Sequence, residues 1–411
     1  MQSLLVLGRQ PELGLAELES LYGSDKVQLA QEKIAVVDVD PCLLAFDRLG
    51  GSVKFAKVLL ELDTQNWDKV VDFITKASPK QSESMPKGKM TLGISEYGFN
   101  QTPKNIIKAG LNVKRAVQST DRPVRFVPNK ASELSSAQVI HNKLTSPNGW
   151  ELLLIKSKAK TIIAQSVKVQ DISAYARRDQ QRPNRDAAVG MLPPKLAQII
   201  INLSVGTLPD EARQSVCEIP PEQIIPITSQ GKTVLDPFCG SGVILQEALL
   251  MGYSVIGSDI DQRMADYSNA NIDWLIKNTK NLEKPSFNIF KGDALNTKWS
   301  PFNFVSSEVF LGKPLSFSAT KAQIDEELKI CNQKIKEFLT NLHTQIDQNT
   351  RICLAVPAWR LSPNHYISLP LIDHLGDLGY NLLSLKGAGS RLIYARPNQI
   401  VARQLIILTR K

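Results

Sequence analysis

The alternation of apolar and polar positions predicts a mixed α/β chain. Apolar runs with a two-residue period predict strands at 3–8, 33–40, 52–62 and 90–98, and two more over 150–170 that meet at a basic turn. Apolar residues at helical spacing predict helices at 11–23, 42–51, 66–78 and 102–118. A polar loop is expected at 79–89. The first 170 residues therefore read as two mixed units, 1–60 and 61–170.

The second half of the chain has a different pattern. Residues 171–195 are rich in Arg and Pro with little helical periodicity, and they predict a junction. A helix is expected at 196–206, then a proline-rich loop up to Gln230. From Thr233 strands and helices alternate, which predicts a parallel α/β sheet closed by an antiparallel hairpin over 392–409. Residues 196–411 thus form the expected doubly wound domain.

Composition supports ordinary folded domains. The chain has 411 residues, 43% hydrophobic and 22% charged, which suits two or three globular domains. It has no apolar run near the roughly 20 residues that cross a bilayer, and its N-terminus lacks signal-peptide features, so a cytoplasmic protein without a membrane partner is expected. The five cysteines and four histidines are scattered, which predicts reduced thiols and no metal.

The positive charge is concentrated in one segment. Residues 101–180 contain 14 Lys or Arg and 5 Asp or Glu, whereas the formal net charge of the whole chain is +9. Such a segment favours a polyanionic partner, and a nucleic acid is the default candidate; a solvated lysine-rich surface is the alternative. On the helix expected at 102–118, Lys104, Lys108 and Arg115 are candidate substrate contacts.

The stretch LDPFCGSGVILQEALLMGYSVIGSDID, residues 235–261, predicts a nucleotide-type site. Asp236 ends a buried strand, and Gly240 and Gly242 allow a tight turn and close approach of a ligand to the backbone. The next helix directs its N-terminus at that ligand. Asp259, at the end of the second strand, can accept hydrogen bonds from ribose hydroxyls, and Asp293 lies where an adenine edge is expected.

The spacing of this loop separates two cofactors. Dinucleotide enzymes use G-x-G-x-x-G against a pyrophosphate, whereas this loop is D-x-x-x-G-x-G. An acid directly before the glycines is unfavourable beside pyrophosphate and suits the amino group of a methionine moiety. No Gly-Lys-Ser/Thr follows, which excludes a P-loop. S-adenosyl-L-methionine is therefore favoured over NAD.

At this point the chain resembles a known family. DPFCGSGVILQEAL, YARRDQQRPNRDAAVGMLPPKLAQIIINLS and the C-terminal LIYARPNQIVARQLIIL are similar to motifs of RNA N2-guanosine methyltransferases with an N-terminal THUMP domain. The resemblance covers about 170–411 by motif, and 1–170 by domain order and charge. It implies a ferredoxin-like unit at 1–60, a THUMP-like RNA-binding unit at 61–170, and a Rossmann-like methyltransferase domain.

The resemblance also implies roles for particular residues. Arg178, Asp179, Arg182 and Pro183 match the segment before the catalytic core, where they order the junction or contact substrate phosphate. The expected cofactor-binding residues are Asp236, Phe238, Gly240, Gly242, Asp259, Ile260, Asp293 and Ala294.

The chain departs from the family at the fourth strand. Enzymes that methylate amines carry Asp/Asn-Pro-Pro-Tyr/Phe there, whose acid orients the amine and whose ring stacks on the flipped base. Here the stretch is NFVSSEVFLGKPLSF, so Glu308 stands for the acid, while Val309 and Phe310 replace the prolines. Phe310 supplies the ring only if the local register differs. The departure therefore predicts either a rearranged working site, or altered chemistry or lost activity.

These features together predict an S-adenosylmethionine-dependent enzyme acting on an exocyclic amine of RNA, most readily tRNA. A DNA amino-methyltransferase and a non-catalytic RNA-binding protein are the alternatives. Downstream, Trp359 and Arg360 are expected on a loop at the carboxyl edge of the sheet, where base or phosphate contact competes with packing; Arg391 precedes the hairpin.

Overall fold

The computed structural model describes residues 1–186, 191–208, 229, 231–280, 282, 286–316, 319–362 and 365–411. The chain forms two compact units. Unit 1 comprises residues 1–11, 25–47 and 52–173, and unit 2 comprises 12–24, 48–51 and 174–411. The proline-rich loop expected before Gln230 lies almost wholly outside the described residues.

Unit 1 is built on one eight-stranded sheet that spans both expected N-terminal units. Its order is β2 (Val27–Gln31), β3 (Ile34–Val37), β1 (Ser3–Leu7), β4 (Ser52–Leu62), β8 (Thr161–Val169), β7 (Gly149–Lys156), β5 (Met90–Tyr97) and β6 (Val124–Phe126). The pairs of β5 with β6 and β7 are parallel and the other pairs are antiparallel. Residues 1–60 and 61–170 are joined through the pairing of β4 with β8.

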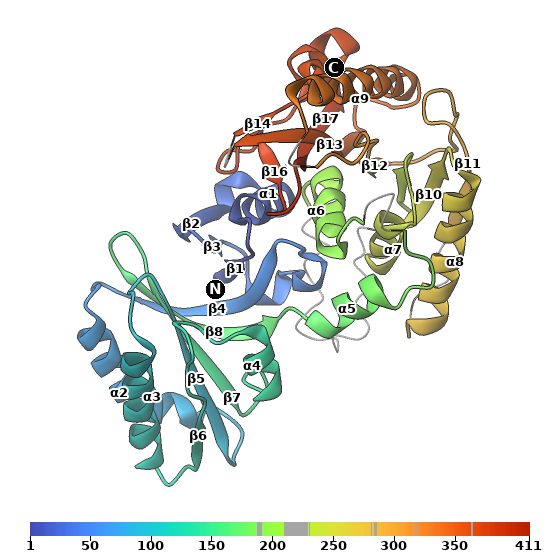
Figure 1. The fold of residues 1–411 in the computed structure, drawn as a ribbon. Coiled ribbons are helices and arrows are strands. Elements are labelled where there is room, and N and C mark those ends of the chain that lie inside the picture. Colours follow the sequence, from blue (N-terminus) through green and yellow to red (C-terminus); the bar gives the residue numbers. More distant parts are fainter. Residues whose placement is uncertain are drawn as a thin grey trace. The chain divides into compact units, whose positions relative to one another are not determined.

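Helices α2 (Trp67–Glu83) and α3 (Pro103–Gln118) lie side by side against the β5–β6 end of this sheet (Figure 1). Their inward positions, such as Val70, Ile74, Ile106 and Val113, are buried against strand residues. Thr102 caps α3, and Pro103 occupies its first turn. A short helix, α4 (Ser136–His141), begins with a Ser135 capping box.

Unit 2 is a doubly wound sheet. Its order is β11 (Phe287–Lys291), β10 (Ser254–Asp259), β9 (Thr233–Asp236), β12 (Phe304–Glu308), β13 (Arg351–Ser362), β17 (Val401–Arg410) and β15 (Tyr380–Leu382). The first five strands are parallel, and β17 runs antiparallel to both of its neighbours. Strand β14 (His365–Ile367) pairs with β13, and β16 (Leu392–Tyr394) forms the expected antiparallel pair with β17.

Helices cover both faces of this sheet, as the continuous apolar run of β13 requires. Alternate β13 residues point to opposite faces. Cys353 and Ala355 join the core under α6 (Pro194–Val205), α7 (Val243–Leu250) and α8 (Gln262–Asn278). Ile352 and Leu354 join the core under α9 (Lys321–His343) and the 3₁₀ segment Pro370–Leu378.

One N-terminal helix belongs to unit 2. In α1 (Pro11–Tyr22), Leu13 and Ala16 join the core under α6, and the buried Glu17 carboxylate accepts hydrogen bonds from Gly50 N (2.9 Å), Gly51 N (2.9 Å) and Asn202 Nδ2 (2.7 Å). Burial raises the pKa of Glu17 to about 7, although these donors oppose the rise. Residues 12–24 and 48–51 are therefore structural parts of the second unit.

Several local predictions are wrong. The expected helix at 42–51 is replaced by the 3₁₀ turns Pro41–Leu43 and Phe46–Arg48, because the amides of Gly50 and Gly51 bond to Glu17 instead of to a preceding turn. Helix α2 continues into the expected loop at 79–89, with Pro79 inside it. The junction contains a helix, α5 (Ile172–Gln180).

Trp359 is also misplaced by the sequence pattern. Strand β13 extends to Ser362, and the Trp359 side chain is fully buried in the α9-side core rather than on a loop. Arg360 also lies in β13, where it donates a hydrogen bond to the Tyr366 hydroxyl. Within the described part of the chain, no helix combines the length and apolarity needed to cross a membrane.

Candidate cofactor and catalytic site

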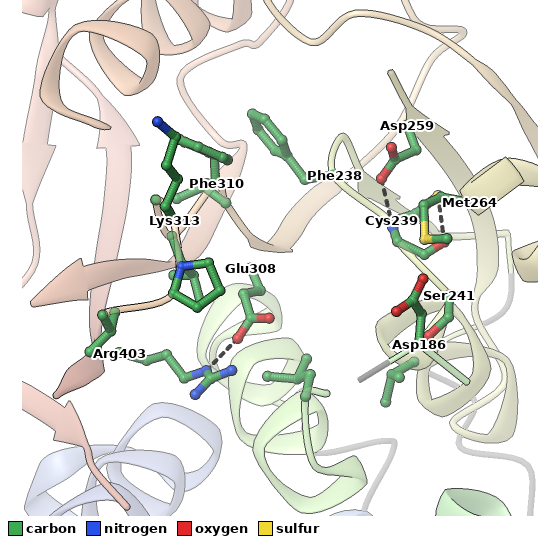
Figure 2. A pocket seen from close by; sticks show the side chains of 18 of the residues that line it. Asp186, Phe238, Cys239, Ser241, Asp259, Met264, Glu308, Phe310, Lys313 and Arg403 are labelled. Carbon is green, nitrogen blue, oxygen red and sulfur yellow. Dashed lines mark hydrogen bonds and ion pairs between the residues drawn. The ribbon is translucent and has the colours of Figure 1, made fainter. Parts of the chain in front are cut away.

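A cavity of about 600 Å³ opens at the carboxyl ends of β9, β10 and β12. Strand β10 pairs with one edge of β9 and β12 pairs with the other edge, so the strand order reverses at β9. Ligands of open α/β folds bind at such a switch point. Its walls come from the Gly-rich turn, the end of β10, the segment after β12 and the start of β17. Figure 2 shows Asp259, Met264, Ser241 and Asp186 on one side and Glu308, Arg403, Phe310 and Lys313 on the other.

Asp236 is the last residue of β9 and lines the cavity. Its carboxylate accepts hydrogen bonds from Ser307 Oγ (2.6 Å) and Phe238 N (3.2 Å), and its side chain is buried. Burial raises the pKa of Asp236 to about 7; these hydrogen bonds lower it, and nearby Asp259 and Glu308 add to the rise. A bound cation would stabilise the charged form of this carboxylate.

The two glycines of the turn have left-handed backbones. Gly240 has φ +50° and Gly242 has φ +81°, conformations that favour glycine. A side chain at Gly242 would stand 2.3 Å from Ser268 Oγ, whereas the space beside Gly240 is open and belongs to the cavity. Gly240 therefore leaves room for a ligand to approach the backbone, and Gly242 allows α7 to begin.

Asp259 ends β10 and is held by the backbone. One carboxylate oxygen accepts from Gly240 N and the other from Asp261 N, each at 3.0 Å (the first is dashed in Figure 2). Partial burial raises the pKa of Asp259, while these two hydrogen bonds oppose the rise. The carboxylate is thereby fixed at the cavity wall, where it can accept from a diol.

The remaining expected cofactor residues divide into two groups. Phe238 and Ile260 line the cavity, and the Ile260 side chain is 65% exposed, which leaves an apolar surface for a flat ring. Asp293 and Ala294 follow β11 and do not line the cavity. Asp293 Oδ1 accepts from Leu295 N at 3.0 Å, and Ala294 is buried against the α9-side core.

Glu308 and Arg403 both line the cavity and form an ion pair there. Arg403, on β17, donates from Nε to Glu308 Oε1, and the two side chains are 6% and 17% exposed (Figure 2). Glu308 is the last residue of β12, so the structure places it where the resemblance expects an acid. Arg403 lies 95 residues away in sequence, and no spacing pattern connects the two.

Phe310 lies on the segment that follows Glu308. Its ring lines the cavity and lies 4.4 Å, centroid to nitrogen, from Lys334 Nζ of α9. The buried Glu327 carboxylate, also on α9, accepts from Lys313 N at 2.9 Å. Gly312, which lies between Phe310 and Lys313 in the sequence, has φ +83°. This clamp by α9 orders a segment that lacks the two prolines of the family motif.

The pre-core residues lie in and after α5. Arg178 makes two hydrogen bonds to Glu247 of α7, from Nε at 2.7 Å and Nη2 at 3.2 Å, and its guanidinium lies over the Tyr175 ring. The Arg182 side chain is buried, and burial lowers its pKa. Asp179 is half-buried. Arg178 thus ties the junction to α7.

The expected basic contacts lie on unit 1. Lys104, Lys108 and Arg115 are exposed along α3, on the side opposite the buried Ile106 and Val113. The charge is therefore available to a polyanion. Among the described residues, no group of three His, Cys, Asp or Glu side chains could hold a metal ion.

The sequence pattern did not identify several residues of the cavity. Ser307 binds Asp236, Arg403 binds Glu308, and Asp186 lines the cavity and pairs with Arg263 at 3.2 Å. Asn398 and Gln399, in the turn before β17, also line it. Only Asp186 carried a sequence signal, since it lies within the pre-core motif.

The sheet order, the antiparallel β17 and the cavity at the switch point define a Rossmann-like fold of the methyltransferase type. Two solved structures share it. TrmN from Thermus thermophilus has 15% identity and a TM-score of 0.50 over 100% of both chains. A possible methylase from Clostridium difficile has 13% identity and a TM-score of 0.50 over 98% of this chain and 97% of that one. At these identities the likeness establishes the fold.

Sequence comparison adds named relatives. A family profile described as DNA methylase matches residues 119–270. A tRNA (guanine(10)-N2)-dimethyltransferase from Methanothermobacter thermautotrophicus is 28% identical over 198 residues, 47% of this chain and 46% of the relative. One from Methanocaldococcus jannaschii is 38% identical over 84 residues, 20% of this chain and 18% of the relative. The matches thus span less than half of either relative, and the resemblance to tRNA guanine-N2 methyltransferases is confirmed.

Proposed function

We propose that this protein is an S-adenosyl-L-methionine-dependent RNA methyltransferase that methylates an exocyclic base amine, guanosine N2, in tRNA. The observation that carries the proposal is the position of Glu308, which ends β12 at the same cavity as Asp236 and Asp259. A cofactor side and a substrate side thereby meet at the switch point of the sheet. The named function of the curated relatives supports the choice of nucleotide.

The cavity residues fit the proposed cofactor. The open space beside Gly240 admits a ligand to the backbone, and the Asp236 carboxylate suits a methionine ammonium group. The fixed Asp259 carboxylate suits two ribose hydroxyls, with Phe238 and Ile260 beside the adenine. When bound, the cofactor supplies an electrophilic methyl group. In this proposal Asp293 and Ala294 support the adenine end indirectly, since they do not line the cavity.

The proposed chemistry depends on alignment. Glu308 accepts a hydrogen bond from the target amine and turns its lone pair toward the methyl group, and the Phe310 ring stacks on the flipped base. The base nitrogen would attack the methyl carbon as the bond from that carbon to the cofactor sulfur breaks, so that S-adenosylhomocysteine leaves and the methylated amine loses a proton to solvent. Closure of the cavity around the base would exclude water. No metal is needed for this reaction.

The N-terminal unit would deliver the RNA. We assign a ferredoxin-like role to 1–60 and a THUMP-like role to 61–170, with Lys104, Lys108 and Arg115 contacting backbone phosphates, which positions RNA rather than reads it. A tRNA substrate would place the protein in the cytoplasm. Arg178, Asp179 and Arg182 would order the junction between RNA-binding and catalytic residues, since Arg178 is bound to Glu247.

Methyl transfer from labelled S-adenosylmethionine tests the proposal. The protein is incubated with tRNA from cells that lack it, and the digested nucleosides are identified by mass spectrometry. We expect N2-methylguanosine, formed much more slowly by Glu308→Gln and at the wild-type rate by the control Glu326→Gln, an exposed α9 residue. Methylated DNA under the same conditions would support the DNA alternative that the family profile suggests. Binding of tRNA without transfer would leave the non-catalytic alternative.

A further inference from the structure

Arg403 is a buried cation on the substrate side of the cavity that the proposed mechanism has not used. Its Nε is engaged by Glu308 Oε1. Within the described chain, its two terminal nitrogens make no hydrogen bond, and neither is enclosed in the protein interior. Elsewhere in the unit the Arg48 and Arg182 guanidinium groups do have enclosed, unpaired nitrogens. The free N–H groups of Arg403 are therefore not enclosed, and Arg403 is one of the residues that line the cavity.

Strand pairing fixes the backbone from which Arg403 projects. Residue 403 pairs with Pro357 of β13 on one side and Tyr394 of β16 on the other, so strand pairing on both sides of β17 holds it in register. Glu308 stands at the end of β12, one strand beyond β13. Two rigid strand positions thus present one acceptor and one donor side by side (Figure 2).

We infer that Arg403 and Glu308 act as one recognition pair, in which Glu308 Oε2 accepts from the target amine and an Arg403 terminal N–H donates to the ring nitrogen beside that amine. The inference rests on the proposed function. Such a pair matches the edge N–C–NH₂, which guanine presents through N3 and N2, and which adenine and cytosine also contain. Uracil has no exocyclic amine and does not match.

Arg403 also replaces a missing constraint. Two prolines after the acid would restrict the backbone of the motif, whereas here Val309 and Phe310 follow Glu308. A guanidinium bound through Nε holds the carboxylate in one orientation, and a bound carboxylate leaves its second oxygen for the substrate. Arg403 is thus a positioning residue for Glu308 as well as a contact for the base.

The test compares Arg403→Met, Arg403→Lys and the matched control Arg410→Met, a residue of the same strand that bonds to Ile346 O outside the cavity. Single-turnover methyl transfer to tRNA, S-adenosylhomocysteine affinity, tRNA affinity and thermal melting are measured for each. In Arg403→Met we expect transfer to slow about 100-fold, as when an oriented donor is removed from an active site, with both affinities within about twofold. Arg403→Lys should be faster than Arg403→Met, because lysine restores the positive charge but not the planar set of guanidinium N–H donors.

The double variant Glu308→Gln/Arg403→Met guards against a folding defect, because it leaves no unpaired buried carboxylate. It should be no slower than Glu308→Gln alone, since the two residues act as a unit. A wild-type rate in Arg403→Met, a slow rate explained by lost cofactor affinity or melting, or multiplicative losses in the double variant would each overturn the inference while leaving the enzyme proposal intact. A methyl group found on uridine or ribose would also overturn it. Absence of transfer by the wild-type protein would overturn the proposed function and this inference together.

Discussion

The Ser307 hydroxyl on β12 donates a 2.6 Å hydrogen bond to the Asp236 carboxylate on β9, across the point where the sheet order reverses. The two strands are neighbours, so the bond joins β9, which carries Asp236, to β12, which carries Glu308. It satisfies one oxygen of a buried carboxylate whose pKa burial raises to about 7. The first two predictions follow from this group.

Cofactor affinity should depend on pH through Asp236. In the proposed site the charged carboxylate attracts the methionine ammonium, whereas the protonated form that prevails below about pH 7 does not. Calorimetry with S-adenosylmethionine should show binding that weakens by about tenfold for each pH unit below 7. Asp236→Asn should bind more weakly and show no such slope; an unchanged slope in that variant would assign the pH dependence to another group.

Asp236→Asn should also stabilise the protein at alkaline pH. The ordinary pKa of an unfolded Asp is about 3.9, so between about pH 4 and pH 7 the folded chain keeps a proton that the unfolded chain loses, and stability falls as pH rises across this range. Asn cannot ionise. Urea unfolding should show the advantage of the variant growing by about 2.5 kcal/mol between pH 5 and pH 8. Glu17 contributes the same pH dependence of stability to the wild-type protein and to the variant, so its contribution cancels in the difference. The control Asp273→Asn changes an exposed carboxylate and should give no gain in stability between pH 5 and pH 8.

Gly312→Ala should impair the segment that carries Phe310. The backbone at 312 is left-handed, and an added Cβ would stand 2.9 Å from Glu327 Oε2, the group that holds Lys313 N. The strain alone costs about 1–2 kcal/mol. We expect a lower melting temperature and slower methyl transfer with cofactor affinity preserved. Gly376→Ala, where a Cβ meets open space, is the matched control; equal effects of both would contradict this account.

Arg178→Met should destabilise the fold rather than weaken RNA binding. It would leave Glu247, which is 1% exposed, as a buried carboxylate without its cation. Breaking such a pair typically costs about 3–5 kcal/mol. Denaturant unfolding should show a loss of this order, with tRNA affinity near the wild-type value at temperatures where the variant is folded. The exposed neighbour Arg177→Met should be neutral in stability, and a pure loss of tRNA affinity in Arg178→Met would assign Arg178 to the substrate.

Lys104→Gln and Lys108→Gln should weaken tRNA binding without affecting stability. Both side chains are exposed on α3, where they can displace counterions from phosphates. Filter binding at several salt concentrations gives the slope of the logarithm of the association constant against the logarithm of the salt concentration. This negative slope should become shallower by about 1 for each lysine that is replaced. Lys336→Gln on α9 serves as the control. Slopes unchanged by all three substitutions would place the RNA surface elsewhere.

The sequence alone could predict the elements whose order is set by local pattern. The strands and glycines around Asp236, the acid at the end of β10 and the hairpin before β17 were all readable, because each is encoded within a few residues. The sequence also showed that Val309 and Phe310 replace the two prolines of the family motif after Glu308. The structure places Glu308 at the end of β12, the strand end where it was expected. Local signals therefore located the site.

What the sequence could not predict depends on distant partners. The apparent helix at 42–51 fails because Glu17, more than 30 residues earlier, takes the amides of Gly50 and Gly51. Trp359 was expected on a loop, but pairing with β14 and β17 extends β13 and places Trp359 in a buried strand position. Arg403 and Glu308 are 95 residues apart, so their pairing is a property of the sheet order alone.

The membership of α1 in the second unit has a consequence for inheritance. The gene for the catalytic fold is not one continuous stretch, since residues 12–24 and 48–51 are encoded within the N-terminal region. A recombination event at the junction that exchanged the first 173 residues would remove Leu13, Ala16 and Glu17 from the core on α6. Inheritance of an intact second unit therefore requires residues 12–24 and 48–51 as well as the C-terminal region.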